Sequence, residues 1–469
     1  MLEQLEHQQK LTINQWKIAV AATLGDMLDF FDFLLIGFVL AFIVKGWSLT
    51  YGQSGLILLA SGIGAPIGSI FWGWVADKVG RRTVFIATIL NVALATGAMA
   101  LTPDRGWLFL VICRFFVGIG TTGVYSVDIT LMQEFLPATK RGWLTGLTTT
   151  MLPAGFLLGA ILGRYATPYI GWRGLVLCGL VPALLALLIR VWVPETPHWL
   201  MRKGRIAEAR KSLAWVLMMD PKDIELPAVA PAIERTRWLE LFKYPRSLVA
   251  GCLTGLSQTG GVGLALWVVT LLVMVLKVTP AVASGLIIWI SISAILGRFF
   301  CSWLSDAMGR RGGGVLACLF AAVFMALAGY LHSVVVAGVS MFYVMLLLQS
   351  FFGSGNYSIV GPYMGELWPA RLRGSGMGLV YGVGNLGKFI GPLGLALIAG
   401  SNNFVKPAAT LDALVPGFLY FAFWYVLGAA AFWFIGFETS GRTIDDIDRQ
   451  LSAQTAGGTA AAVGRSAGN

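Results

Sequence analysis

The sequence is poor in charge. Only 12% of its 469 residues are charged, whereas 57% are hydrophobic. Soluble domains typically carry about 25% charged residues. A soluble fold could not bury this much apolar surface, so we expect the lipid bilayer to surround most of the chain.

Residues that bind metals or form disulfides are also scarce. The chain has five cysteines, none of them in a CxxC spacing, and three scattered histidines. We therefore expect no metal site, no cofactor and no disulfides. No Gly-x-x-x-x-Gly-Lys-Ser/Thr loop occurs, and no nucleophile lies beside a base in the sequence. These absences argue against ATP-driven transport and against an enzyme.

Long apolar runs are abundant. Twelve runs of the length of a membrane span are present, with a polar segment between the sixth and the seventh. They lie near residues 18–44, 54–76, 83–101, 107–132, 143–165, 172–193, 248–276, 282–304, 312–332, 336–362, 374–400 and 412–436. The pattern predicts an all-α membrane protein with twelve transmembrane helices in two pseudo-symmetric six-helix bundles.

The domain organisation follows from these runs. We expect a cytoplasmic N-terminus (1–17), an N-terminal bundle (18–194), a cytoplasmic amphipathic linker (195–247), a C-terminal bundle (248–437) and a cytoplasmic C-terminal tail (438–469), disordered at its end. In the linker, Ile206, Ala209, Leu213 and Val216 have helical spacing, which predicts an amphipathic helix on the inner face of the membrane.

The net charge of +11 is unevenly placed along the chain. Most lysines and arginines fall on the side of the N-terminus, which the positive-inside rule assigns to the cytoplasm. The basic excess therefore indicates topology rather than nucleic-acid binding. We expect a monomer in the plasma membrane, as a multi-pass protein of the bacterial inner membrane with both termini in the cytoplasm.

Two loop motifs occur once in each half. Gly73-Trp-Val-Ala-Asp77-Lys-Val-Gly80-Arg81-Arg82 returns as Ser302-Trp-Leu-Ser-Asp306-Ala-Met-Gly309-Arg310-Arg311, and Glu134-x-x-Pro137-x-x-x-Arg141 returns as Glu366-x-x-Pro369-x-x-x-Arg373. Such duplication is typical of transporters whose two halves rock about a shared site. We expect the loop arginines to pair with Glu134 and Glu366 in one conformational state and to separate in the other. The predicted gating residues are Gly73, Asp77, Arg81, Arg82, Glu134, Arg141, Asp306, Arg310, Arg311, Glu366 and Arg373. The alternative is plain anchoring of the loops at the membrane surface.

The repeated loop resembles the hallmark of the major facilitator superfamily, and the resemblance extends through residue 447. Pro194-Glu195-Thr196-Pro197 and Phe437-Glu438-Thr439-Ser440 are similar to an element of sugar porters, with Phe437 where those proteins usually carry proline. The resemblance adds Glu195 and Glu438 to the gating set. Arg114-x-x-x-Gly118-x-Gly120 is similar to the motif of the fourth span.

A finer resemblance concerns the transported compound. Asp29-Phe-Phe-Asp32 is similar to an element of aromatic-acid:proton symporters and of related niacin and carboxylate transporters, with Phe30 in place of glycine. Lys388 stands where relatives of that branch often carry arginine. The resemblance implies a secondary transporter that imports a small organic anion together with protons. Gln258-Thr259-Gly260-Gly261 only partly matches the Gln-Gln-x-x-Gly pattern of sugar porters, which argues against a sugar.

Several ionisable residues lie inside the predicted spans, and each costs about 2.5–3.5 kcal/mol at the bilayer centre. They include Asp26, Asp29, Asp32, Arg114, Asp128, Arg298 and Lys388. At a rise of 1.5 Å per residue, Asp32, Arg114 and Lys388 lie at depths of about 21, 19 and 21 Å from the inner face. This coincidence predicts a central site shared by both halves.

The acidic residues of the first span predict proton coupling. Asp26, Asp29 and Asp32 share one helix face, and close carboxylates resist joint ionisation, so that one of them can hold a proton. Our hypothesis is that Asp32 or Asp29 exchanges a proton as its contact with Arg114 breaks and reforms. The alternative is a static ion pair.

Lys388 is the predicted anchor for an anionic group of the substrate; the alternative is a structural pairing with one of the aspartates. Aromatic and amide side chains would complete the pocket. The candidates are Tyr125, Gln258, Trp267, Asn356, Tyr357, Tyr381 and Asn385.

Three other functions remain open from the sequence. The acidic first span would also suit a proton-coupled transporter or exporter of an organic cation or drug. A neutral, sugar-like metabolite is a further possible substrate. A nutrient sensor is a third possibility, although such proteins usually carry a longer cytoplasmic extension.

Overall fold

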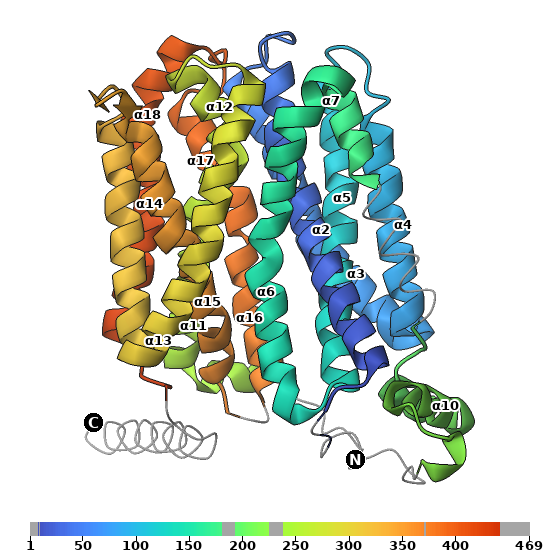
Figure 1. Ribbon diagram of the computed structural model, residues 1–469. Helices are drawn as coiled ribbons and strands as arrows, with labels where there is room; N and C mark the ends of the chain where they lie inside the picture. Colours follow the sequence, from blue (N-terminus) through green and yellow to red (C-terminus); the bar gives the residue numbers. More distant parts are fainter. Residues whose placement is uncertain (1–7, 9, 181–192, 225–237, 370–371, 441–469) are drawn as a thin grey trace, which may run out of the picture. The chain divides into compact units, whose positions relative to one another are not determined.

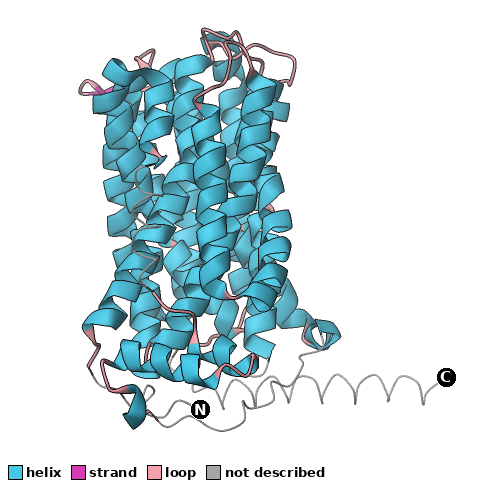
Figure 2. Cartoon of the chain, turned by 90° about the vertical axis from the view of Figure 1, so that its right-hand side faces the viewer, coloured by secondary structure: helices cyan, strands magenta, loops and turns pink. Residues whose placement is uncertain are grey.

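A computed structural model describes residues 8, 10–180, 193–224, 238–369 and 372–440. Within these ranges some side chains are not described, among them those of Asp29, Asp77, Arg81, Tyr125, Glu134 and Arg141. The described chain is almost entirely helical (Figure 2). Its strands in this part are β1 (Val335–Val336) and β2 (Val339–Ser340), which pair antiparallel with Val335 opposite Ser340. The all-α prediction is confirmed.

The first half of the chain forms long helices, which are labelled in Figure 1. They are α2 (Ile13–Ile43), α3 (Tyr51–Val79), α4 (Arg81–Met99), α5 (Trp107–Phe135), α6 (Ala138–Ile161), the π-helical turn η1 (Leu162–Ala166) and α7 (Thr167–Cys178). The polar residues before the first two helices set where they begin. Thr12 and Thr50 each form a capping box with the glutamine three residues later, which satisfies backbone N–H groups that would otherwise have no acceptor. Most of the predicted sixth span, residues 181–192, lies outside the described residues.

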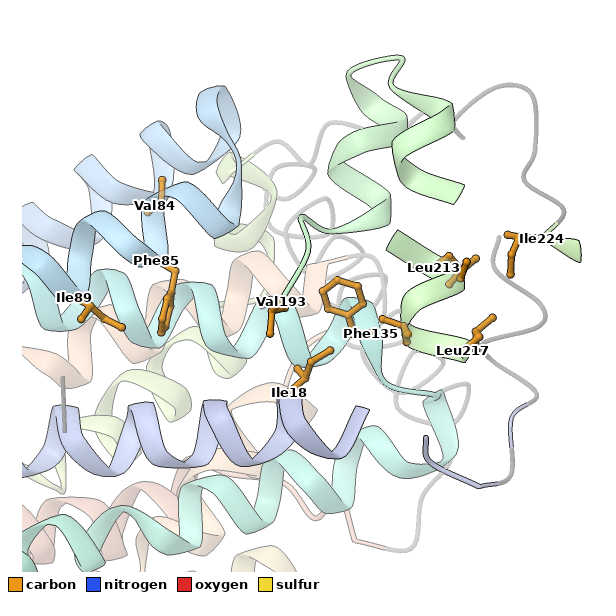
Figure 3. Close-up of a cluster of buried hydrophobic side chains, with 11 residues drawn as sticks. Ile18, Val84, Phe85, Ile89, Phe135, Val193, Leu213, Leu217 and Ile224 are labelled. Carbon is orange, nitrogen blue, oxygen red and sulfur yellow. The ribbon is translucent and has the colours of Figure 1, made fainter. Parts of the chain in front are cut away.

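The linker contains the predicted amphipathic helix. Its elements are α9 (Pro197–Arg202), α10 (Ile206–Leu217) and the 3-10 turns η2 (Pro221–Asp223) and η3 (Trp238–Lys243). Leu213 and Val216 of α10 are buried in one cluster with Ile18, Phe85 and Phe135, at the ends of α2, α4 and α5 (Figure 3). The apolar face of α10 therefore packs on protein and not, as the sequence suggested, on lipid.

Polar contacts fix the register of this docking. The Thr12 hydroxyl donates to the Val216 carbonyl (2.6 Å) and the Asn14 amide donates to the Trp215 carbonyl (2.7 Å). These bonds supply donors to two carbonyl groups in the last turn of α10, where no N–H group of the same helix is available to bond to them. The beginning of the first span thus holds the linker in place.

The second half differs from the uninterrupted spans that hydropathy predicts. Its helices are α11 (Pro245–Leu256), α12 (Thr259–Val275), α13 (Pro280–Tyr330), α14 (Met341–Gly355), α15 (Tyr357–Glu366), α16 (Arg373–Asn385), α17 (Gly387–Ile398), α18 (Pro407–Ala430) and the π-helical turn η5 (Ala431–Ile435). The predicted spans seven, ten and eleven each contain a short break of one or two residues, at 257–258, 356 and 386, where Ser257, Asn356 and Leu386 keep helical φ and ψ angles. The predicted spans eight and nine form the two parts of α13, which a kink at Gly309 separates.

Five described segments are long and apolar enough to cross a membrane by length and composition. They are Tyr51–Ala76, Arg82–Met99, Pro245–Val275, Pro280–Tyr330 and Pro407–Ile435. Many large apolar side chains on these helices are exposed, including Leu94, Trp289 and Trp303. Such surfaces fit contact with lipid rather than with water.

The chain forms two compact units. The first comprises residues 1–233, 265–291 and 399–411, and the second comprises residues 234–264, 292–398 and 412–469. The second-half segment 399–411 joins the first unit through main-chain bonds, from Tyr51 N to Asn403 O (2.8 Å) and from Val405 N to Leu49 O (3.1 Å). The units therefore do not coincide with the predicted bundle boundaries, and each is described by itself below.

Candidate functional site

Arg114 is the centre of a buried polar site in the first unit. It is 1% exposed, and its guanidinium donates to the main-chain carbonyls of Asp32 and Phe33 (both 2.8 Å) and to the Ser61 hydroxyl (2.9 Å). Helices α5, α2 and α3 thus meet at one side chain. These three acceptors are oriented neutral dipoles, which contribute to solvating the positive charge of Arg114.

The next feature is the set of aspartates in the first span, of which Asp26 and Asp32 have described side chains. Asp26 and Asp32 are buried, at 1% and 5% exposure. Asp32 Oδ1 faces Gly179, at the end of α7. The side chains of Asp29 and Asp128 lie outside the described residues. The structure therefore brings Asp32 and Arg114 together, as the depth estimate predicted; proton exchange between them stays a prediction.

In the second unit, the breaks of three spans meet. The Asn356 amide, between α14 and α15, donates to the hydroxyl of Ser257, between α11 and α12 (3.4 Å). Gly387, the first residue of α17, packs so closely on Thr259 that an added Cβ would lie 2.6 Å from its hydroxyl oxygen. Discontinuous helices form the binding sites of many transporters, so the meeting point of these short breaks is a candidate site.

Several predicted substrate residues gather at these breaks. Gln258 is 6% exposed and its amide donates to the Ser257 hydroxyl (3.4 Å), while Asn356 is fully buried. Asn385 ends α16, and Lys388 is half-buried in the first turn of α17. Lys388 brings a positive charge to this group of neutral polar side chains, and this charge favours an anion.

A second cation lies in the same unit. Arg298 is 3% exposed, its Nε donates to the Ser354 hydroxyl (3.2 Å), and its guanidinium lies 5.1 Å from the centre of the Tyr357 ring. Tyr381, on α16, is half-buried. Sequence reasoning singled out Arg298 as a buried charge but gave it no role in the pocket.

Two other predicted pocket residues, Trp267 and Tyr125, belong to the first unit. Trp267 belongs to the first unit, is fully buried, and packs on Tyr51 with ring centres 5.7 Å apart. Tyr51 in turn bonds to the Thr410 hydroxyl (2.7 Å). Tyr125 is on α5, and its side chain lies outside the described residues. The aromatic spacing alone could not distinguish wall residues from packing residues.

The gating loop of the second half is organised around Glu438. Its carboxylate accepts main-chain N–H groups from Arg310 (2.8 Å), Arg311 (3.1 Å), Thr439 (3.1 Å) and Ser440 (2.9 Å). Arg310 begins the second part of α13, where free N–H groups and the helix dipole favour an anion. Glu438 therefore acts as a cap supplied from the end of the last span.

The arginine side chains have other partners. Arg310 contacts Glu366 through two atom pairs of 3.4 Å, and also contacts Asp306 (3.4 Å). The Arg310–Glu366 contact is the pairing expected from the sequence; its role in gating stays a prediction. Arg311 instead donates to the main-chain carbonyls of Phe432 (3.2 Å) and Trp433. Arg373 is half-buried as the first residue of α16.

The first half repeats the same capping arrangement. The Glu195 carboxylate accepts the N–H of Arg82 (3.2 Å), at the beginning of α4, and the N–H of Thr196 (3.1 Å). Gly73 lies on α3, just before the loop. The side chains of Asp77, Arg81, Glu134 and Arg141 lie outside the described residues. The two copies of the motif therefore agree where they can be compared.

Sequence reasoning missed three contributors to the second gating loop. The Thr439 hydroxyl donates to Glu366 Oε2 (2.5 Å), the Ser305 hydroxyl accepts from Arg310 (2.8 Å), and Arg246 donates to the Ile435 carbonyl (2.6 Å). Thr439 follows the recognised Glu438 and could have been found from that motif. Ser305 lies in the repeated motif, directly before Asp306, and could also have been found there, whereas Arg246 lies outside every recognised motif. Among the described residues, no group of three His, Cys, Asp or Glu side chains is arranged to hold a metal ion.

Replacing Gly309 by alanine is expected to disrupt this loop. Gly309 has φ +81 and ψ 165, a conformation that is essentially restricted to glycine, and an added Cβ would lie 2.6 Å from the carboxyl carbon of Glu438. Strain and displacement of the cap together should destabilise the protein by roughly 1–3 kcal/mol. Thermal unfolding of the purified variant in detergent measures this change.

Gly361→Ala is the matched control, because an alanine Cβ on this helical residue meets no atom within 4 Å. We expect it to unfold at or slightly above the wild-type temperature, since alanine favours a helix. Equal melting temperatures for the Gly309→Ala and Gly361→Ala variants would contradict the assigned role of Gly309.

Known proteins provide an independent comparison. The sequence model of the family described as "Sugar (and other) transporter" matches residues 17–451. The chain is 31% identical to the niacin transporter NiaP of Acinetobacter baylyi over 435 residues, which cover 90% of this chain and 94% of that protein. It is 25% identical to the cis,cis-muconate transport protein of the same organism, with coverage of 83% and 89%.

Solved structures agree on the fold. The crystal structure of a D-xylose–proton symporter matches with a TM-score of 0.72 and 20% identity, over 91% of this chain and 99% of that one. A partially occluded, inward-open structure of the xylose transporter XylE of Escherichia coli matches equally well, with a TM-score of 0.72, 18% identity, and coverage of 92% and 100%. At this identity the likeness supports the fold alone.

Proposed function

Because the chain belongs to the sugar (and other) transporter family of the major facilitator superfamily, we propose that it imports a small organic anion together with protons by alternating access. The family has twelve transmembrane helices in two halves, and its members are membrane transporters of small molecules rather than enzymes. The proposal concerns the charge of the substrate and the coupling ion.

The observation that carries the proposal is the charge of the second half. Between residues 246 and 437 the only acidic residues are Asp306, Glu366 and Asp412, at the ends of predicted spans. Arg298 and Lys388 lie within the spans. Since Lys388 lies beside the meeting point of three short helix breaks, its positive charge there favours a carboxylate.

The relatives support an acidic substrate. Niacin and cis,cis-muconate, the compounds named for two relatives, are both carboxylic acids. We propose that a carboxylate of the substrate contacts Lys388 and that Gln258, Asn356, Tyr357, Tyr381 and Asn385 contact the rest of the molecule. Aromatic walls with a few polar anchors suit a small planar acid.

Proton coupling is proposed for the first unit. Asp26 and Asp32 are buried, and Arg114 donates to the main-chain carbonyl of Asp32. Burial makes a charged carboxylate costly, so a proton gained or lost there changes the stability of the surrounding packing. A protein of the same fold is a D-xylose–proton symporter, so the fold is compatible with coupling to protons. Release and rebinding of a proton at Asp32 or Asp29 would accompany the change of conformation.

The gating role of the two capping glutamates is likewise proposed. Glu195 and Glu438 fix the loops that carry the paired arginines, and the Arg310–Glu366 contact is of a kind that can break in another conformation. We also propose that both termini lie in the cytoplasm, that the protein is located in a bacterial inner membrane, and that it acts as a monomer. The positive-inside distribution of Lys and Arg supports the orientation.

A neutral sugar is the competing substrate, and the xylose symporter favours it. Uptake into proteoliposomes distinguishes the two. We expect radiolabelled nicotinate, benzoate or muconate to accumulate when the outside is made acidic, and xylose, glucose and a cationic dye not to accumulate. Accumulation of xylose but of no carboxylate would refute the anion proposal, and uptake that is indifferent to the pH gradient would refute proton coupling.

A further inference from the structure

The hydroxyl of Tyr363 forms a two-way clamp on the main chain of Phe437. It donates to the Phe437 carbonyl (3.1 Å) and accepts the Phe437 N–H (3.1 Å). Tyr363 is fully buried near the end of α15, and its ring packs on Phe432 with ring centres 5.0 Å apart. One side chain thus satisfies both main-chain groups of the residue that directly precedes Glu438.

The clamp requires the residue types that this half provides. In the first copy of the motif, Pro194 takes the place of Phe437 before Glu195, and Leu131 takes the place of Tyr363 three residues before Glu134. Leucine has no hydroxyl to donate or accept, and proline has no N–H to donate. Neither of the two hydrogen bonds of the clamp can therefore form in the first half. Proline fixes its own φ angle instead. The second half therefore replaces a covalent restraint by a hydrogen-bonded one.

Other contacts converge on the same segment. Arg246 donates to the carbonyls of Ile435 (2.6 Å) and Gly436 (3.3 Å), and Arg311 donates to the Phe432 carbonyl (3.2 Å). These bonds fix the chain up to Gly436, and Glu438 caps the turn at Arg310 after it. Phe437 is the link between the two, and Tyr363 is the side chain that bonds to its main chain.

We propose that Tyr363 is a positioning residue, which holds the Glu438 carboxylate at the beginning of the Arg310 helix and thereby sets the rate of the conformational step without contacting the substrate. This inference rests on the proposed gating role of Glu438. It predicts a change in the maximal rate of transport rather than in the affinity for the transported compound.

Amide hydrogen exchange of the full-length protein tests the clamp without a substrate. In Tyr363→Phe, we expect the main-chain amides of Arg310 and Arg311 to exchange roughly three- to tenfold faster, because the Glu438 carboxylate that accepts them is less firmly held. In proteoliposomes, we measure uptake of whichever of nicotinate, benzoate and muconate the wild-type protein accumulates. Its maximal uptake rate should fall by a similar factor, with the KM changed by less than about twofold.

Phe437→Pro provides the diagnostic second variant. Gly436 has φ −60 and ψ 156, a conformation that a following proline favours. Because the proline ring restrains position 437 by itself, Tyr363→Phe should have less than half its effect in the Phe437→Pro background. An equal effect in both backgrounds, or no change of exchange at Arg310 and Arg311 in Tyr363→Phe, would overturn the inference.

Two controls separate this inference from the gating proposal. Tyr420→Phe removes a comparable hydroxyl bond, to the Ile390 carbonyl (2.7 Å), and should leave exchange at Arg310 and Arg311 unchanged. Glu438→Gln should accelerate their exchange and lower the uptake rate. If Glu438→Gln lowers the rate but Tyr363→Phe does not, only the clamp is refuted. If Glu438→Gln leaves the rate unchanged, the gating role is refuted.

Discussion

Lys388→Gln is expected to raise the KM for a carboxylate substrate roughly tenfold to a hundredfold. A hydrogen bond to a charged group contributes about 1.5–3 kcal/mol, and each 1.4 kcal/mol is a factor of ten in affinity. Concentration-dependent uptake of the carboxylate into proteoliposomes, and its thermal shift on the purified protein, measure the change.

The amide analogue of the same acid makes this test specific. The neutral analogue binds without the charge, so the Lys388→Gln variant should lose its preference for the acid over the amide. Lys277→Gln, in the loop between α12 and α13, is the matched control and should keep the wild-type KM. Normal affinity of the Lys388→Gln variant for the carboxylate would remove Lys388 from the substrate site.

Asp32→Asn is expected to abolish uphill uptake while exchange of substrate across the membrane continues. Asparagine preserves the size of the buried side chain, and the described bond from Arg114 to residue 32 is to the main-chain carbonyl, which the substitution keeps. It removes the group that can gain and lose a proton. We expect accumulation driven by an imposed pH gradient to fall at least tenfold, and counterflow exchange to remain within about threefold of wild type, since proton transfer contributes only to the coupled cycle.

Parallel variants identify which aspartate carries the proton. Asp29→Asn and Asp26→Asn are measured in the same two assays, because the three residues share one helix face. Asp104→Asn, which alters an exposed ion pair with Arg173 (2.9 Å), is the control and should change neither activity. Equal loss of accumulation and exchange in Asp32→Asn would indicate a structural role and contradict coupling at this residue.

The accuracy of the sequence-based predictions depends on the kind of interaction. The pairing of Arg310 with Glu366 was predictable because oppositely charged side chains recur together in the duplicated loops. The proximity of Asp32 and Arg114 was predictable from helical rise and the bilayer thickness. The partners of Arg114 and Arg311 were not predictable, because both donate to main-chain carbonyls, which every residue possesses. The packing of Trp267 on Tyr51 could not be predicted either, because contacts between apolar side chains of distant segments produce no characteristic sequence pattern.

The sequence by itself determined that the chain is a duplicated, all-helical membrane transporter, because hydropathy and repeated motifs are properties of local segments. It also placed the buried charges along the chain, since a charged residue in an apolar run stands out whatever surrounds it. Only the tertiary structure decided where spans seven, ten and eleven break, which residues meet at those breaks, and that Tyr363 holds the residue before Glu438. These features depend on contacts between segments far apart in the chain, where the packing of one helix against another, rather than the preference of either, fixes the conformation.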